Sequence, residues 1–97
     1  MKPKVYSLDI DGTLTKTSAW TEEECLTVEP RLDVIKRINE LFHFNFIIIH
    51  TARRHELYMS TIQWLQKHNV RYHAIRMEKM PADVIVDLDV INKLEDL

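Results

Sequence analysis

Residues 7–15 read Ser7-Leu8-Asp9-Ile10-Asp11-Gly12-Thr13-Leu14-Thr15. The segment from Val5 to Asp9 predicts a short buried strand that ends in acidic residues. Gly12 is the only glycine of the chain, which indicates a backbone conformation that other residues resist at this position. A turn at Gly12 would let the carboxylates of Asp9 and Asp11 face the same cavity. The stretch therefore predicts a strand followed by a turn that presents two acidic side chains.

Apolar residues beyond this stretch recur with the spacing of helices and strands. Pro30 suits the first turn of a helix, which we expect to end near residues 43–45, with an inner face of Leu32, Ile35, Ile38 and Phe42. Residues 46–49 form an apolar run that predicts a buried parallel strand. A second helix follows and ends near Asn69, with an inner face of Leu57, Ile62, Leu65 and Tyr58.

Shorter segments complete the predicted order of elements. We expect residues 13–29 to form a loop or flap over the end of the first strand, residues 72–75 and 84–86 to form strands, and residues 90–97 to form a helix. Strands that alternate with helices predict an α/β fold with right-handed crossovers. The expected architecture is a Rossmann-like parallel sheet of about four strands, flanked by helices and without a cap domain.

Composition limits the classes of function. The 97 residues predict a single domain over residues 1–97. A net charge of −2 gives no electrostatic reason to expect nucleic acid or an anionic membrane as partner. The longest apolar run is far too short to cross a bilayer, and no signal peptide is visible. The single cysteine, Cys25, fits a reducing compartment, so we expect a cytoplasmic protein.

Polar residues gather at the predicted strand ends. Asp9 and Asp11 come at the end of the first strand, Thr51 follows the second, and Asp87 follows the last. Parallel sheets bind ligands outside the carboxyl ends of their strands. Chance explains one or two such residues, whereas four form a pattern. We therefore expect a ligand site at this rim.

The pair Asp9 and Asp11 predicts a magnesium site. Two carboxylates this close repel each other unless a cation or a shared proton intervenes. Mg²⁺ prefers oxygen ligands and keeps waters and substrate phosphate in its shell. A solvated acidic turn is the alternative for an isolated Asp-x-Asp-Gly sequence. A calcium loop is another, although the later acidic ligands that it needs are missing after Gly12.

Other residues at the rim are candidates for holding a phosphoryl group. The Thr51 hydroxyl and the amides at the following helix start suit a phosphoryl oxygen, but Thr51 suits a helix N-cap equally well. Lys79 would neutralise an anion, although a lone surface lysine usually has no such role. Asp87 and Asp89 flank Leu88, and either acid would complete a metal site or cap the last helix.

In their order, these elements resemble the haloacid dehalogenase superfamily of phosphotransferases over nearly the whole chain. Residues 9–13 match its first motif, Asp-x-Asp-Gly-Thr after a strand. Residues 47–51 match the second, an apolar strand that ends in Thr or Ser. Lys79 matches the third, and residues 86–89 match the fourth, an acidic pair, in part. Residues 30–35 and 51–54 also resemble small capless members found beside capsular polysaccharide genes and in phage genomes.

The resemblance implies a phosphohydrolase mechanism. Asp9 would attack phosphorus and form an aspartyl-phosphate, and Asp11 would first protonate the leaving oxygen and then activate water. Mg²⁺ would be held by Asp9, the Asp11 carbonyl and a fourth-motif acid, for which Asp87 is the candidate. Thr51 and Lys79 would stabilise the transferring group. The remaining substrate-binding residues implied by the match are Gly12, Thr13, Ala52 and Arg53.

One departure from the pattern keeps a second hypothesis open. Leu88 occupies the second acidic position of the fourth motif. Either Asp87 or Asp89 would have to substitute for that acid, but we expect both to point to the opposite face from Leu88 if the strand continues. The first hypothesis is a phosphatase, and the second is a catalytically weakened or inactive module that binds phosphate or metal. A purely structural domain would leave the acidic pair unexplained.

The expected partner is a small phosphorylated substrate of unspecified identity. Without a cap, an open site would accept a bulky substrate or be covered by a neighbouring subunit, so a homo-oligomer is one expectation. Trp20, in the predicted flap, is a candidate substrate contact or a core residue. Arg53, Arg54 and His55 would reach an anionic part of the substrate or form a solvated helix start.

Overall fold

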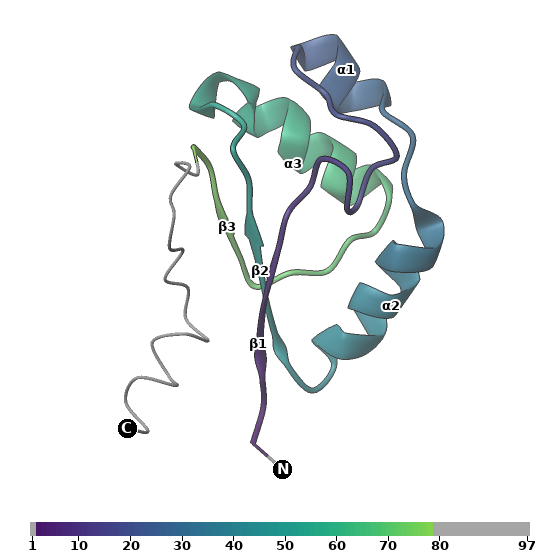
Figure 1. The fold of residues 1–97 in the computed structure, drawn as a ribbon, viewed down its shortest axis with the longest axis vertical. Coiled ribbons are helices and arrows are strands. Elements are labelled where there is room, and N and C mark those ends of the chain that lie inside the picture. The colour runs from purple at the N-terminus through teal and green to yellow at the C-terminus, as the bar shows by residue number, and fades with distance from the viewer. Residues whose placement is uncertain (1, 79–97) are drawn as a thin grey trace.

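The computed structural model describes residues 2–78. The predicted strand 84–86 and helix 90–97 lie outside the described residues, as do Lys79, Asp87, Leu88 and Asp89. The elements, in chain order, are β1 (Val5–Leu8), α1 (Glu22–Thr27), α2 (Leu32–Phe42), β2 (Phe46–His50), the 3₁₀ helix η1 (His55–Leu57), α3 (Tyr58–Lys67) and β3 (Ala74–Arg76). Figure 1 shows this arrangement. None of the helices within residues 2–78 combines the length and the apolar character needed to cross a bilayer.

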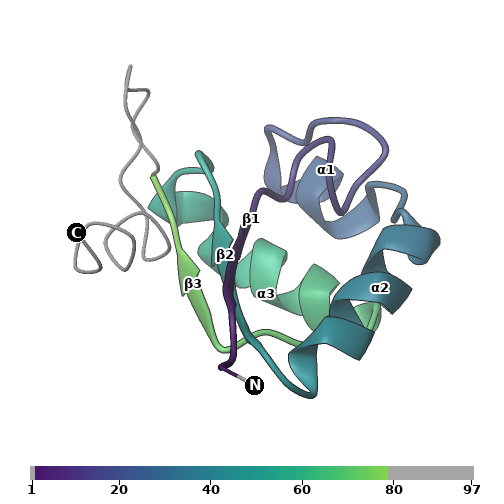
Figure 2. The same cartoon turned by 60° about the horizontal axis from the view of Figure 1, so that its bottom comes forward.

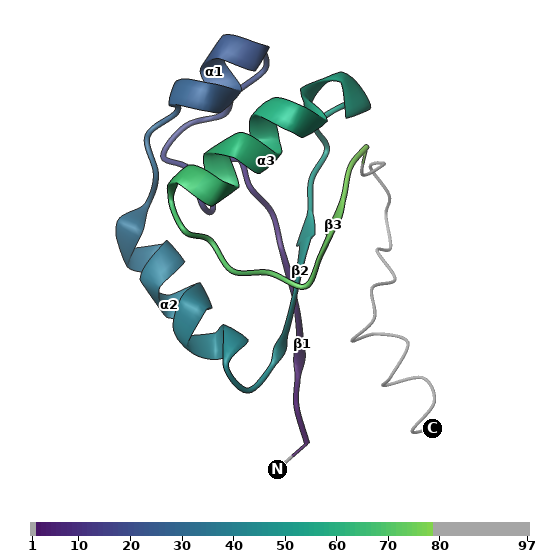
Figure 3. The same cartoon turned by 180° about the vertical axis from the view of Figure 1, so that it is seen from behind.

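The three strands form a parallel sheet in the order β1-β2-β3. Leu8 is paired with Ile49, and Ile49 with Ile75. The helices α2 and α3 connect successive strands and lie on the same side of the sheet (Figure 2), as two right-handed crossovers in one direction require. Seen from behind, α3 lies in front of the strands (Figure 3). The predicted α/β class, with a parallel sheet flanked by helices, is confirmed.

The core lies between this sheet and its helices. Ile47 and Ile49 of β2 are completely buried, and the Trp64 side chain of α3 is buried beside them in the same cluster. The helix spacing was wrong for Leu32, which is exposed; the buried face of α2 begins one turn later, at Ile35.

The prediction of a loop over residues 13–29 was wrong for the part that forms α1. Thr21 caps this helix: its side chain accepts the Glu24 N–H at 3.1 Å, and the Glu24 carboxylate accepts the Thr21 N–H at 3.0 Å. This reciprocal capping box stabilises a helix start, and Cys25 then becomes buried on the side where α1 packs against α3. The Thr-x-x-Glu signal was present in the sequence.

Candidate active site at the strand ends

A tight turn follows β1. The Ile10 carbonyl accepts hydrogen bonds from three amides, at 3.1, 2.9 and 3.2 Å, which belong to Thr13, Leu14 and Thr15. Gly12 has a φ of +82°, and a Cβ added there would meet nothing within 4 Å. The requirement for glycine is therefore set by backbone conformation alone, because this φ strains residues that carry a Cβ.

Asp9 lies at the open edge of this turn. Its side chain is exposed, and one carboxylate oxygen accepts the Ile10 N–H at 2.9 Å. That bond fixes the orientation of the carboxylate while leaving its second oxygen without a hydrogen bond to another of the described residues. Asp9 is thus accessible to a ligand and is held in one orientation.

Asp11 is held differently, by a forked ion pair with Arg53. The Arg53 Nε donates to Asp11 Oδ2 at 3.1 Å, and Nη2 donates to Oδ1 at 2.9 Å. The remaining Nη1 donates to the Thr61 hydroxyl at 3.0 Å, and the Ala19 N–H donates to Asp11 Oδ1 at 3.0 Å. The side chain of Arg53 is 0% exposed and that of Asp11 is 16% exposed. Such bidentate pairs are among the stronger hydrogen-bonded interactions in proteins.

This ion pair joins the turn after β1 to the loop after β2. A carboxylate offers about four acceptor positions, and Asp11 uses three of them for Arg53 and Ala19. Every guanidinium nitrogen of Arg53 is engaged with Asp11 or Thr61. In this structure the Arg53 side chain therefore orients Asp11, and the substrate contact predicted for Arg53 stays a prediction.

Thr51 shapes the second loop. It is completely buried, and its hydroxyl oxygen accepts the Arg53 N–H at 3.1 Å, as in a turn stabilised by Ser or Thr. The N-cap alternative for Thr51 is wrong, because η1 begins only at His55 and α3 begins at Tyr58 with Leu57 at its cap. The hydroxyl hydrogen of Thr51 still has donor capacity, and its contact with a phosphoryl group stays a prediction.

The two loops also present main-chain amides. The Gly12 N–H donates to the Thr15 hydroxyl and the Thr13 N–H to a carbonyl within the turn. By contrast, the N–H groups of Asp11 and Ala52 donate no hydrogen bond to another of the described residues. Unpaired amides in such turns attract anions. Of the predicted substrate-binding residues, Gly12 and Ala52 are exposed and Thr13 is half-buried.

The available oxygen atoms fit the donor set that Mg²⁺ prefers. Asp9 offers an exposed carboxylate oxygen, and the main-chain carbonyl of Asp11 accepts no hydrogen bond from the described residues. The Asp11 carboxylate itself is engaged by Arg53. Residues 2–78 contain no cluster of three or more His, Cys, Asp or Glu side chains arranged to bind a metal. Mg²⁺ commonly takes one or two carboxylates together with waters and substrate phosphate, so the two described oxygens suit part of such a site.

Cys25 lies near the ion pair but does not qualify as a nucleophile. It is completely buried, and burial raises the pKa of its thiol above the ordinary value, an effect that the Arg53 guanidinium opposes and the Asp11 carboxylate reinforces. Because the thiolate is the reactive form of cysteine, a buried thiol with a raised pKa is inert at neutral pH.

Three supporting residues were missed by the sequence-based predictions. Thr15 is buried, and its hydroxyl donates to the Thr17 carbonyl at 2.6 Å while accepting the Gly12 N–H. Thr61 and the amide of Ala19 hold the ion pair from α3 and from the segment before α1. Thr15 lies two residues after the first motif, whereas no local pattern marks Ala19 or Thr61.

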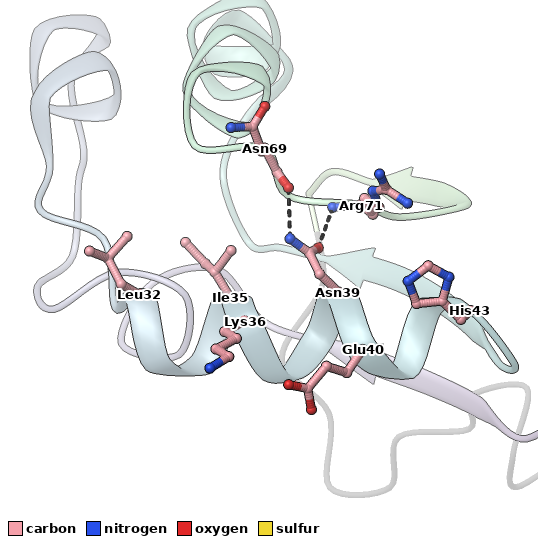
Figure 4. Close-up of a pocket in the computed structure, with 8 residues that line it drawn as sticks. All are labelled: Leu32, Ile35, Lys36, Asn39, Glu40, His43, Asn69 and Arg71. Carbon is pink, nitrogen blue, oxygen red and sulfur yellow. Dashed lines mark hydrogen bonds between the residues drawn. The ribbon is translucent and has the colours of Figure 1, made fainter.

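A separate groove of about 520 Å³ runs along α2 (Figure 4). Asn39 spans one side of it: its side chain donates to the Asn69 carbonyl at 2.8 Å and accepts the Arg71 N–H at 2.9 Å. The groove is lined by Leu32, Ile35, Lys36, Asn39, Glu40, His43, Asn69 and Arg71. None of the predicted site residues lines it, so the candidate site remains at the strand ends.

Comparison with known proteins agrees with this fold. No protein-family profile matches the sequence, and no curated protein does. A structural-genomics target from Vibrio cholerae is similar with a TM-score of 0.68 and 30% sequence identity, over 87% of this chain and 79% of that chain. A chain of the Pnkp1/Rnl/Hen1 complex is similar with a TM-score of 0.64 and 19% identity, over 96% of this chain and 33% of that chain, which shows the fold alone. The chain therefore belongs to the same family as the Vibrio cholerae protein, and its fold is consistent with a small haloacid dehalogenase-like domain.

Proposed function

We propose that the protein hydrolyses a phosphomonoester in a Mg²⁺-dependent reaction through an aspartyl-phosphate on Asp9. One observation carries the proposal: an exposed carboxylate, Asp9, stands two residues from a second carboxylate, Asp11, which a buried arginine holds in a fixed orientation. Catalysis with a nucleophile and a separate proton donor needs such a difference between two neighbouring acids. The order of motifs in the sequence supports the same reaction.

In the first step, the free carboxylate oxygen of Asp9 bonds to phosphorus as the bond from phosphorus to the leaving oxygen breaks. Asp11, in the form protonated at the position that Arg53 and Ala19 leave unused, donates that proton to the leaving oxygen. In the second step, Asp11 takes a proton from water, the water oxygen bonds to phosphorus, and the bond to Asp9 breaks, which returns the enzyme and releases phosphate. The acceptor position of Asp11 not used by Arg53 or Ala19 is the one available for these transfers.

The phosphoryl oxygens would be held by groups from both loops. The amides of Asp11 and Ala52 are available as donors, and we assign charge stabilisation to Thr51 and Lys79 as well. Lys79 follows Glu78, whose N–H donates to the Arg53 carbonyl at 2.8 Å. Bound Mg²⁺, held by Asp9, the Asp11 carbonyl and Asp87, would neutralise charge on the phosphoryl group.

A second candidate function is a module that binds phosphate or metal with little or no turnover. The observation in its favour is Leu88, which stands where the fourth motif carries its second acid. The two candidates share the site and differ in turnover, so one assay separates them.

The test is phosphate release from 4-nitrophenyl phosphate, with and without Mg²⁺, by the unmodified protein and by Asp9→Asn. We expect release that requires Mg²⁺ and falls by more than about 10³-fold in Asp9→Asn, because loss of a nucleophile removes the covalent route. Asp33→Asn is the matched control, since Asp33 is an exposed acid in the first turn of α2, outside the site, and should leave the rate unchanged.

Two results would contradict the proposal. Release that persists in Asp9→Asn would exclude Asp9 as the nucleophile. Absence of release from any of a panel of phosphomonoesters, combined with Mg²⁺-dependent phosphate binding, would favour the binding module. In that case, recovery of turnover in Leu88→Asp would identify the missing acid as the cause.

A further inference from the structure

We propose that a cavity beside Asp11 is the leaving-group subsite and that it accepts a planar aromatic ring. The cavity has a volume of about 250 Å³ and is lined by Trp20, Ala52, Arg53, Arg54, Glu56 and Leu57. The inference rests on the proposed function, because it names the class of phosphomonoester that the same site would hydrolyse: one whose alcohol carries an aromatic ring.

The position of the cavity relative to Asp11 follows from covalent and hydrogen-bonded links. Arg53 lines the cavity and forms the forked ion pair with Asp11. Trp20, on another wall, directly follows Ala19, whose N–H donates to Asp11 Oδ1 at 3.0 Å. Because Asp11 is the residue that would protonate the leaving oxygen, a cavity whose walls include the ion-pair partner of Asp11 and the residue after Ala19 is in position to take the rest of the leaving group.

Trp20 is the aromatic residue that lines this cavity. The residue is 68% exposed, which is unusual for tryptophan in a protein of this size. Its backbone is nevertheless fixed, because the Trp20 N–H donates to the Glu24 carboxylate at 3.1 Å, within the capped start of α1. An exposed ring on a fixed backbone offers a face on which another ring can stack at little entropic cost.

The size of the cavity and the polarity of its lining favour a ligand with a single aromatic ring system. A cavity of about 150 Å³ is enough for benzene, so about 250 Å³ holds one or two fused rings. Ala52 and Leu57 provide apolar contacts in addition to Trp20. The side chains of Arg54 and Glu56 form no hydrogen bond or ion pair with other described residues, so they remain available for polar substituents on the ring.

The kinetic test compares benzyl phosphate with cyclohexylmethyl phosphate, whose leaving groups are similar primary alcohols that differ in aromaticity. We expect the unmodified protein to prefer the benzyl ester in kcat/KM by roughly 2- to 10-fold, the size of a ring-stacking contribution. Trp20→Ala should remove the preference, and Trp20→Phe should retain most of it. Phe44→Ala removes an exposed aromatic residue outside the cavity and is the matched control.

A binding measurement keeps this inference separate from the proposed function. In a two-dimensional NMR titration with benzylphosphonate and Mg²⁺, the indole N–H signal of Trp20 should shift. The indole N–H of Trp64 is buried and donates to the Val28 carbonyl at 2.8 Å, so its signal should stay in place and serve as an internal control. Cyclohexylmethylphosphonate should shift the Trp20 signal less.

The outcomes discriminate as follows. If the ratio of kcat/KM for the two esters is the same in the unmodified protein and in Trp20→Ala, and turnover still needs Asp9, the subsite is overturned. The proposed function then still stands. If neither ester is hydrolysed, the phosphate-release assay with the wider panel tests the proposed function, and the titration tests the cavity: a selective shift of the Trp20 signal supports an aromatic-binding cavity, and an unchanged Trp20 signal overturns it.

Discussion

The two ends of the sheet are built in contrasting ways. At the carboxyl end, the loops after β1 and β2 are joined by the ion pair of Asp11 and Arg53, whose guanidinium is entirely buried. At the amino end, the His73 ring stacks on Phe42 with ring centroids 4.4 Å apart, while Phe44 is 82% exposed. The carboxyl end is held by a buried ion pair, and the amino end by stacked rings.

The contrast shows where the fold accepts an energetic cost. Burying charged groups is unfavourable unless each is paired and hydrogen-bonded, and the guanidinium of Arg53 meets that condition through Asp11 and Thr61. The amino end relies on ring packing and on backbone bonds such as that from the His73 N–H to the Ile47 carbonyl, at 2.8 Å. We therefore expect the carboxyl end to be intolerant of substitution and the amino end to be tolerant.

The largest effect on stability should come from Arg53→Met. Removal of the guanidinium leaves the Asp11 carboxylate with the Ala19 amide and little solvent, and loss of one partner of a buried pair costs about 3–5 kcal/mol. The free energy of unfolding, measured by urea denaturation, should fall by about 3 kcal/mol, at the low end of that range because Asp11 keeps some exposure.

The matched control is the same substitution at an exposed ion pair. Arg37 contacts Glu40 at 3.3 Å, and both side chains are more than half exposed. Arg37→Met should therefore change the free energy of unfolding by less than about 1 kcal/mol. An equal decrease in the free energy of unfolding for Arg53→Met and Arg37→Met would mean that the buried ion pair stabilises the protein no more than the exposed one.

An intermediate effect is expected for Gly12→Ala. Because a Cβ at Gly12 would meet no neighbour within 4 Å, the cost is that of placing alanine at a φ of +82°, about 1–2 kcal/mol. Asn69→Gly is a useful counterpart, since Asn69 already adopts a φ of 56° and glycine should be accepted there with little change. Urea denaturation of both variants measures the difference, and an unchanged Gly12→Ala would show that the turn relaxes.

The smallest effect is expected at the amino end, for Phe44→Ala. An exposed side chain makes few contacts to lose, so the free energy of unfolding should change by no more than about 0.5 kcal/mol. Thermal and urea denaturation provide the measurement. A loss above about 1 kcal/mol would show that Phe44 is covered in solution, and the contrast between the two ends would then disappear.

Local sequence patterns were sufficient for the order of the three strands and of α2 and α3 in the described chain. The apolar run of β2 and the helical spacing of α2 predicted both elements with small errors at their ends. The main error was α1, whose capping box between Thr21 and Glu24 was readable but was outweighed by the polar composition of the segment. Such errors are expected where a short amphipathic helix depends on packing, here of Cys25 against α3.

The location of the site could also be predicted from local patterns, but only in part. Asp9 and Asp11 follow β1 and the Thr51 loop follows β2, and parallel neighbouring strands bring their carboxyl ends to one edge. The contacts that these residues make at that edge could not be predicted from the sequence. The family match implied a substrate contact for Arg53, which stays a prediction, but no local pattern indicated that its guanidinium bonds to Asp11 and Thr61.

By itself, the sequence determined the α/β class, the strand ends that carry the acids and the need for glycine at position 12, because each depends on residues close together along the chain. Only the tertiary structure decided that Asp11 and Arg53, which are 42 positions apart, form a buried pair, and that Trp20 stands beside a cavity next to them. Whether a charged side chain faces a partner or solvent depends on how separate loops pack, and that information is not contained in local periodicity.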